Sequence, residues 1–149
     1  MVSIPQLVPP NTYSNSLQPT LEEVNALSEL SKKVDPINAS WADDQCLHRF
    51  LRATKWDVAK AAARIEDTGK WRREFGPDSI LPEHVEKVAE AGRQFLSGFD
   101  KDGRPIWYMI PARKSTNQSV DDQIRFVVYT IEKAISLMPE NVESLVIIM

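Results

Sequence analysis

The residues of this sequence with the clearest capacity for chemistry are basic side chains that alternate with large apolar ones. The stretch "RFLRATKWD" interleaves the basic residues Arg49, Arg52 and Lys55 with the apolar residues Phe50, Leu51 and Trp56. A guanidinium offers a planar fork to phosphate and an ammonium offers a point charge, so such a series can bind a phosphate group. The same series also suits a solvated helix edge whose aliphatic stems cover the core. Periodicity leaves both interpretations open.

Motifs for catalysis and for cofactors are missing from the sequence. It contains neither a Gly-x-Ser-x-Gly elbow nor a phosphate-binding Gly-x-x-x-x-Gly-Lys. The two histidines, His48 and His84, have no cluster of cysteines or carboxylates at metal-ligand spacing. The single cysteine, Cys46, is expected to be a buried small hydrophobe. We therefore predict no catalytic residues, no metal and no cofactor, and a protein that is not an enzyme.

The stretch "DKDGR" has two possible interpretations. Asp100 and Asp102 stand at alternate positions before Gly103, as calcium ligands do in an EF-hand. An EF-hand loop also needs a glutamate at its twelfth position, where this sequence has Pro111. The short apolar runs on both sides favour a β-hairpin with its turn at Asp-Gly.

Composition and charge narrow the class of protein. The chain has 149 residues, of which 42% are hydrophobic and 26% charged, as in a soluble globular protein. The formal net charge of −3 argues against a nucleic-acid partner. One cysteine allows no internal disulfide, which favours a reducing, intracellular compartment. No signal peptide and no run of about 20 apolar residues are present, so membrane contact is expected to be peripheral.

The first part of the chain has the pattern of helices preceded by an arm. Residues 1–19 contain four prolines and are predicted to be flexible. Helices are expected at about 21–34, 41–54, 58–75 and 82–91. Thr20, Ser40 and Asp57 are the expected caps of the first three, and Pro82 occupies the first turn of the fourth. In the first helix, the expected apolar stripe consists of Leu21, Val24, Leu27 and Leu30.

The second part alternates strands with a helix. Two strands flank the Asp-Gly turn, and Ser119 caps a helix that runs to Met138. Its expected apolar stripe consists of Ile124, Val127, Val128, Ile131 and Ile135. The run "LVIIM" is typical of a strand covered on both faces, and a strand-helix-strand passage predicts a parallel pair. The fold class is therefore α/β, with an all-α bundle before a partial α/β domain.

Two segments resemble one known family. Residues 44–76, "DQCLHRFLRATKWDVAKAAARIEDTGKWRREFG", are similar to the N-terminal helical region of CRAL-TRIO proteins. Residues 99–111, "FDKDGRPIWYMIP", resemble the opening hairpin of their lipid-binding domain. The combination of "RATKW" with "WRREFG" is most similar to the fungal phosphatidylinositol transfer proteins linked to azole drug resistance. The resemblance implies a helical region at 20–92 and the beginning of a lipid-binding domain at 93–149.

The resemblance also implies which residues bind lipid. In members that bind inositol lipids, a basic pair after "LRA" faces the head group, and the aligned residues here are Thr54 and Lys55. Members that exchange phosphatidylcholine have tyrosines in the hairpin of the pocket, where this chain has Leu96 and Trp107. The apolar Leu96 favours a sterol or another apolar lipid as a second ligand. Arg52 belongs to the family-wide pattern and is expected to be structural.

The function implied is transfer of phosphatidylinositol between membranes by a cytoplasmic protein that associates peripherally with intracellular membranes. The expected partners are phosphatidylinositol, a sterol and a transient membrane surface. The alternative is a protein-interaction module whose helical bundle docks a partner, because the family also occurs in regulators of GTPases. The family's pocket needs a further stretch comparable in length to this chain, so these residues alone are expected to be a fragment with an incomplete pocket.

Overall fold

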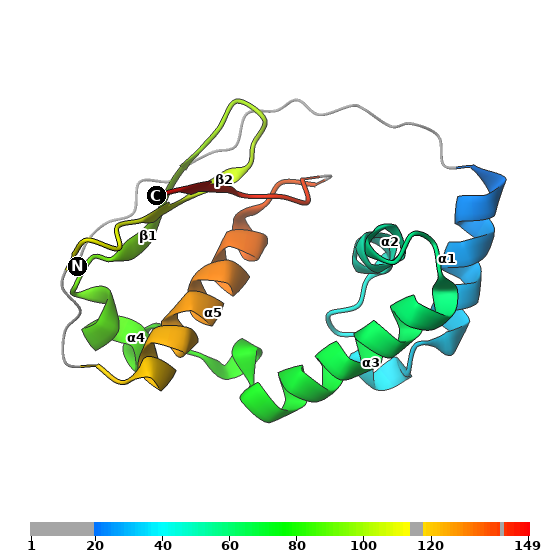
Figure 1. Ribbon diagram of the computed structural model, residues 1–149, viewed down its shortest axis with the longest axis horizontal. Helices are drawn as coiled ribbons and strands as arrows, with labels where there is room; N and C mark the ends of the chain where they lie inside the picture. The colour runs from blue at the N-terminus through cyan, green and yellow to red at the C-terminus, as the bar shows by residue number, and fades with distance from the viewer. Residues whose placement is uncertain (1–19, 114–117, 141) are drawn as a thin grey trace. The chain divides into compact units, whose positions relative to one another are not determined.

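The computed structural model describes residues 20–113, 118–140 and 142–149, which fall into two compact units, 20–76 and 77–149. The predicted arm at residues 1–19 lies outside the described residues. The first unit contains helices α1 (Leu21–Lys33), η1 (Pro36–Asn38), α2 (Asp44–Ala53) and α3 (Val58–Phe75). The second contains η2 (Pro77–Ser79), α4 (Pro82–Ala89), β1 (Gln94–Phe99), β2 (Pro105–Met109), α5 (Val120–Leu137) and β3 (Val146–Ile148). This confirms the predicted order of a helical bundle followed by an α/β part (Figure 1). The predicted domain limits at residue 92 stay a prediction.

Local capping signals set most helix limits in the first unit. The Asp57 carboxylate accepts the backbone N–H of Lys60 at 3.0 Å and begins α3, which ends at Gly76 with φ 68°. The predicted cap of α2 at Ser40 is wrong. Asp43 caps this helix by accepting the N–H of Cys46 at 2.7 Å. A carboxylate at this place satisfies an unpaired N–H and also interacts favourably with the helix dipole.

The core of the first unit lies where α1, α2 and α3 meet. Its buried residues are Leu30, Leu47, Leu51, Ala61 and Ile65. Cys46 is also buried, as expected. The predicted inward stripe of α1 is wrong at its start, because Leu21 and Val24 are 76% and 46% exposed. The rest of the predicted stripe is correct, since Leu30 is fully buried and Leu27 is partly buried against the same core.

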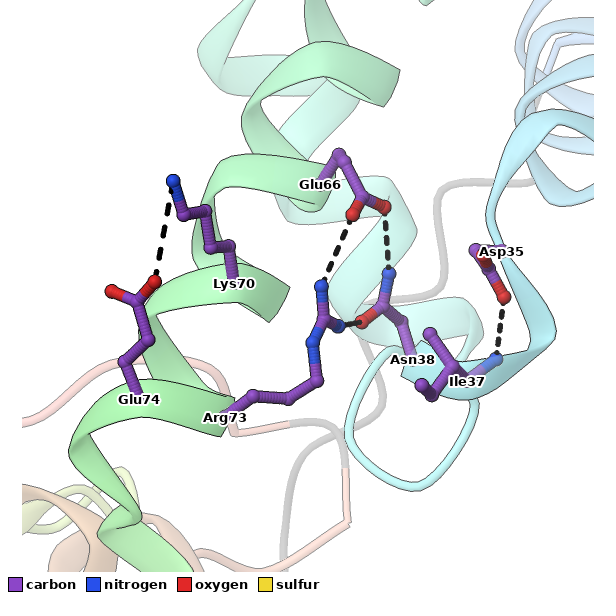
Figure 2. Close-up of polar contacts among 7 residues, drawn as sticks. All are labelled: Asp35, Ile37, Asn38, Glu66, Lys70, Arg73 and Glu74. Carbon is purple, nitrogen blue, oxygen red and sulfur yellow. Dashed lines mark hydrogen bonds and ion pairs between the residues drawn. The ribbon is translucent and has the colours of Figure 1, made fainter.

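A polar cluster around the buried Asn38 side chain fastens η1 to α3. Asn38 is 1% exposed, and its amide nitrogen donates to Glu66 Oε2 at 3.3 Å. Arg73 donates to Asn38 Oδ1 at 3.0 Å and to Glu66 Oε1 at 3.2 Å (Figure 2). Each of the three side chains therefore contacts the other two. Gly69 of α3 lies directly beneath the Asn38 amide.

The second unit is built on a three-stranded sheet in the order β1-β2-β3. β1 and β2 form the predicted antiparallel hairpin, in which Leu96 is paired with Trp107. β3 pairs in parallel with β2, with Ile147 beside Trp107, which confirms the strand-helix-strand prediction. α5 connects β2 to β3 and lies against the sheet (Figure 1).

The face of α5 that is buried differs from the predicted one. The buried residues are Phe126, Thr130 and Ala134, whereas Ile124 and Ile135 of the predicted stripe are 47% and 49% exposed. Thr130 tolerates burial because its hydroxyl donates to the Phe126 carbonyl at 2.7 Å. The small side chain of Ala134 permits close helix packing. Among the described residues β3 is not covered on both faces either, since Ile147 and Ile148 are 50% and 43% exposed.

Candidate functional site

The predicted head-group residues lie in a tight corner after α2. Lys55 and Trp56 both have left-handed backbones, with φ of 54° and 65°. Residues other than glycine rarely adopt this conformation, and each one costs about 1–2 kcal/mol. Backbone bonds hold the corner, since the N–H of Trp56 donates to the Leu51 carbonyl at 2.8 Å. Strain of this kind is concentrated at functional sites.

Thr54 stabilises the corner from inside. Its side chain is buried, and its hydroxyl lies 2.9 Å from the Phe50 carbonyl and 3.2 Å from those of Leu51 and Asp57. All three partners are acceptors, so the single hydroxyl proton is used within the protein. The sequence places Thr54 beside Lys55, and the structure gives it a position from which it fixes the Lys55 backbone.

Trp56 anchors the corner, and Lys55 extends from it. The Trp56 indole packs against the core of the helical unit and makes an edge contact with His48 at 6.1 Å. Lys55 is exposed, and no carboxylate of the described residues pairs with it. The corner therefore presents an unpaired ammonium on a backbone that is fixed on both sides.

Two other cations of the same unit, Lys60 and Arg73, are already paired. Lys60 lies 2.8 Å from Asp57, and Arg73 lies 3.2 Å from Glu66. These two side chains act as parts of the helical surface, as the solvated-edge interpretation predicts. The structure thus separates Lys55 from them, although the sequence does not.

Cys46 is not prepared for nucleophilic chemistry. Burial raises the pKa of its thiol above the ordinary value, against the opposing effect of the neighbouring Arg49 guanidinium. The thiolate is the reactive form of cysteine, and it is disfavoured here.

His84 has a structural position, since its Nδ1 accepts the N–H of Leu81 at 3.1 Å.

The predicted pocket residues are brought together by the hairpin. Leu96 and Trp107 are direct cross-strand partners, so their side chains share one face of the sheet. Trp107 is 4% exposed, and its indole N–H has no hydrogen-bond partner among the described residues. Leu96 is half-buried. These two residues belong to the second unit, and Thr54 and Lys55 belong to the first.

The Asp-Gly turn uses its carboxylates internally. Asp100 accepts the backbone N–H groups of Asp102 and Arg104 at 2.8 and 2.9 Å, and the Arg104 guanidinium bonds both carboxylates. Gly103 has φ 74°, as the turn requires. In the part of the chain that the structure describes, no three metal-ligating side chains come together. The hairpin interpretation of "DKDGR" is confirmed by the pairing of β1 and β2.

The charge of Asp100 makes the hairpin sensitive to acid. Burial opposes ionisation of Asp100, but hydrogen bonds from Arg104 and Asp102 outweigh it and hold the pKa below its ordinary value of 3.8. A carboxyl whose pKa is lower in the folded than in the unfolded protein stabilises the fold at pH values above its unfolded-state pKa. This stabilisation is lost as the pH falls through its folded-state pKa. We expect Asp100→Asn, which keeps the acceptor oxygen, to flatten the loss of thermal stability below about pH 4. Thermal unfolding at a series of pH values measures this, and an unchanged profile would contradict it.

A cleft opens beside the hairpin. It encloses about 280 Å³ between the end of α4, the ends of β1 and β2, and α5. Its lining residues are mostly apolar: Val88, Ala91, Met109, Pro111, Phe126 and Val127, with the polar residues Arg93, Gln94 and Gln123. Arg93 donates to Gln123 Oε1 at 3.3 Å. Sequence reasoning missed this cleft, because its residues come from separate segments and form no local motif.

Two family models match the chain. Residues 20–67 match the model described as "CRAL/TRIO, N-terminal domain", and residues 89–149 match the one described as "CRAL/TRIO domain". The first includes the corner with Lys55, and the second includes the hairpin and every named residue of the cleft except Val88. No helix in the described residues is long and apolar enough to span a membrane.

Curated relatives come mainly from fungi. A CRAL-TRIO domain-containing protein of Schizosaccharomyces pombe is 45% identical over 86% of this chain and 13% of its own length. The phosphatidylinositol transfer protein PDR17 of Saccharomyces cerevisiae is 34% identical over 72% of this chain and 33% of its own length. The SEC14 cytosolic factor of Eremothecium gossypii is 43% identical over 59% of this chain and 30% of its own length. The chain thus spans a third or less of these relatives.

Proposed function

Because this chain belongs to the CRAL-TRIO family, we propose that its protein carries phosphatidylinositol between membranes. The observation that carries the proposal is Lys55, an exposed and unpaired cation held in a strained corner. The relative PDR17, by its name a phosphatidylinositol transfer protein, supports the choice of lipid. The name of the SEC14 relatives, cytosolic factors, supports a cytoplasmic carrier that touches membranes only transiently.

In this proposal the head-group phosphate binds to Lys55, and Thr54 assists. The Lys55 ammonium donates a charge-assisted hydrogen bond to a phosphate oxygen. Thr54 acts by holding the left-handed backbone at Lys55, because its hydroxyl proton already serves carbonyl groups of the corner. A site fixed in advance loses less entropy on binding than one on a mobile loop.

We propose separately that Leu96 and Trp107 line an apolar lipid pocket of the second unit. Both contribute apolar area on one face of the hairpin. Without a tyrosine hydroxyl at position 96, the wall suits a sterol or another apolar second ligand. The protein acts as a carrier and not as an enzyme, with no nucleic-acid partner.

A vesicle assay tests the function. Donor vesicles with labelled phosphatidylinositol are mixed with unlabelled acceptor vesicles and the full-length gene product. We expect transfer of the inositol lipid well above the rate without protein. Mass spectrometry of lipids that co-purify with the protein is the second readout and also identifies any sterol. The proposal would be contradicted if the protein transferred no inositol lipid and no inositol lipid co-purified with it.

A second candidate is a protein-interaction module formed by the helical unit. Apolar side chains on its surface favour it, since Leu21 and Ile37 are 76% and 60% exposed. Substituting both by serine would abolish partner binding under this alternative and would leave lipid transfer unchanged under the lipid-carrier proposal. The vesicle assay separates the two, because an interaction module for which lipid binding is secondary should not transfer labelled inositol lipid above the rate without protein.

The 149 residues made alone should behave differently from the full-length product. The two clefts found beside α4 enclose about 280 and 590 Å³, and the larger is lined by three glutamates, Glu83, Glu86 and Glu90. A phospholipid with two acyl chains is larger than the ligands that fill clefts of about 300–1,000 Å³. The outer edge of β3 is unpaired in the described sheet, and exposed strand edges promote association.

We therefore expect these residues, made alone, to retain no stoichiometric phospholipid and to form dimers or larger species. Size-exclusion chromatography with light scattering measures the association, and Ile147→Lys at the β3 edge should reduce it. A clean monomer that holds one phospholipid would contradict this expectation.

A further inference from the structure

We propose that the cleft between α4, the hairpin and α5 binds a medium-chain monocarboxylate, with the carboxylate on Arg93 and the apolar tail inside. The α4, β1 and α5 segments that border it lie together within the second unit (Figure 1). This inference goes beyond the proposed function, because it involves neither Lys55 nor an inositol head group. Its failure would leave the phosphatidylinositol proposal unaffected.

The charge at Arg93 specifies the head of the ligand. Arg93 is half-buried, and no carboxylate of the described residues lies at ion-pair distance from it. Arg93 donates to the neutral Gln123 amide at 3.3 Å, which uses one of the five guanidinium N–H donors. The Gln123 amide is itself held by the Gln118 carbonyl at 3.4 Å. A cation oriented in this way at the margin of an apolar cleft suits an anionic partner that accepts two hydrogen bonds.

A carboxylate fits better than a phosphate. Among the described residues that line the cleft, Arg93 is the one cation, and its single charge is balanced by a monoanion. A dianion would bring a second negative charge into a largely apolar site, where an unpaired charge is costly. The planar carboxylate also matches the guanidinium fork.

The walls and the volume specify the tail. Val88 and Phe126 are each 8% exposed and form apolar walls, together with Met109 and Val127. The volume of about 280 Å³ is at the lower end of the range that holds drug-sized ligands, about 300–1,000 Å³. One short unbranched chain suits this space, and two acyl chains do not.

Calorimetry on the full-length gene product tests the inference with decanoate, decanol and decyltrimethylammonium as probes. We expect decanoate to bind more tightly than either of the others. Shortening the tail from ten to eight carbons should weaken binding by about fourfold for each methylene. Arg93→Gln should weaken decanoate binding about tenfold and leave decanol unchanged. Lys133→Gln, which removes an exposed cation from α5, is the matched control and should change nothing.

A second variant tests the cleft itself. Ala91→Phe places an aromatic ring in the cleft and should abolish binding of both decanoate and decanol, while far-UV circular dichroism verifies that the helices are retained. Equal binding of decanoate to wild type and Arg93→Gln would overturn the assignment of the head. Unchanged binding to Ala91→Phe, or no binding of decanoate to the wild type, would overturn the assignment of the site.

Discussion

Replacing Gly69 by alanine should destabilise the protein by about 2–3 kcal/mol, although alanine is the better helix former. A Cβ at this position would lie 2.1 Å from Asn38 Oδ1 and 2.8 Å from Asn38 Cγ. The Asn38 amide has no room to retreat, because it is buried and bonded to Glu66 and Arg73 (Figure 2). Relief of the clash requires breaking at least one of these charge-assisted bonds, each of which contributes about 1.5–3 kcal/mol.

The control for this prediction is on the same helix. Ala63 is exposed on α3, so Ala63→Gly measures helix propensity alone and should cost about 1 kcal/mol. If propensity also governed position 69, Gly69→Ala would gain a similar amount. Denaturant unfolding with a two-state analysis separates these opposite signs.

A double variant locates the cause. Asn38→Ala removes the amide that the new Cβ would strike, so Gly69→Ala should be much less harmful in that background. Glu66 and Arg73 still pair directly at 3.2 Å without the amide. Additive effects of the two substitutions would mean that the clash at Asn38 is not the source of the loss.

The elements that the sequence predicts correctly are those with local signals. The limits of α3 follow from the Asp57 carboxylate and from Gly76 with its left-handed backbone, which are adjacent to the helix itself. The hairpin follows in the same way from its Asp-Gly turn. The sequence predicts Ser40 as the cap of α2, and the folded chain shows that Asp43, three residues later, is the N-cap.

The face that a helix buries depends on residues that are distant in the sequence, and the predicted buried face of α5 was wrong. In α5 the buried Thr130 accepts a hydrogen bond from Gln94 at 3.4 Å, across 36 positions of the chain. Hydrophobicity alone favours burial of Ile124 and Ile135 over burial of a threonine. The sequence therefore predicts the helix correctly but assigns the wrong face of it to the core. The same distinction between local and distant information applies to the candidate functional residues. Resemblance indicates Lys55, whereas the cleft at Arg93 arises only when four segments come together.

Lys55→Ala should reduce loading of phosphatidylinositol by about ten- to a hundredfold in the full-length gene product, which corresponds to one charge-assisted hydrogen bond of about 1.5–3 kcal/mol. Stability should change little, because both residues carry a Cβ and meet the same backbone strain at φ 54°. Lys55→Arg keeps the charge and should retain most of the loading. Vesicle-loading assays with labelled inositol lipid measure the first effect, and thermal unfolding measures the second.

Two further variants separate recognition by Lys55 from general attraction to an anionic surface. Arg64 is exposed on α3 of the same unit and has no paired carboxylate in the described residues, so Arg64→Ala removes an equal charge elsewhere and should leave loading unchanged. Lys55→Gly removes the ammonium and relieves the left-handed strain, so it should lose loading as Lys55→Ala does without loss of stability. Equal losses in Arg64→Ala and Lys55→Ala would reduce the role of Lys55 to net charge, and full loading of Lys55→Gly would remove it from the site.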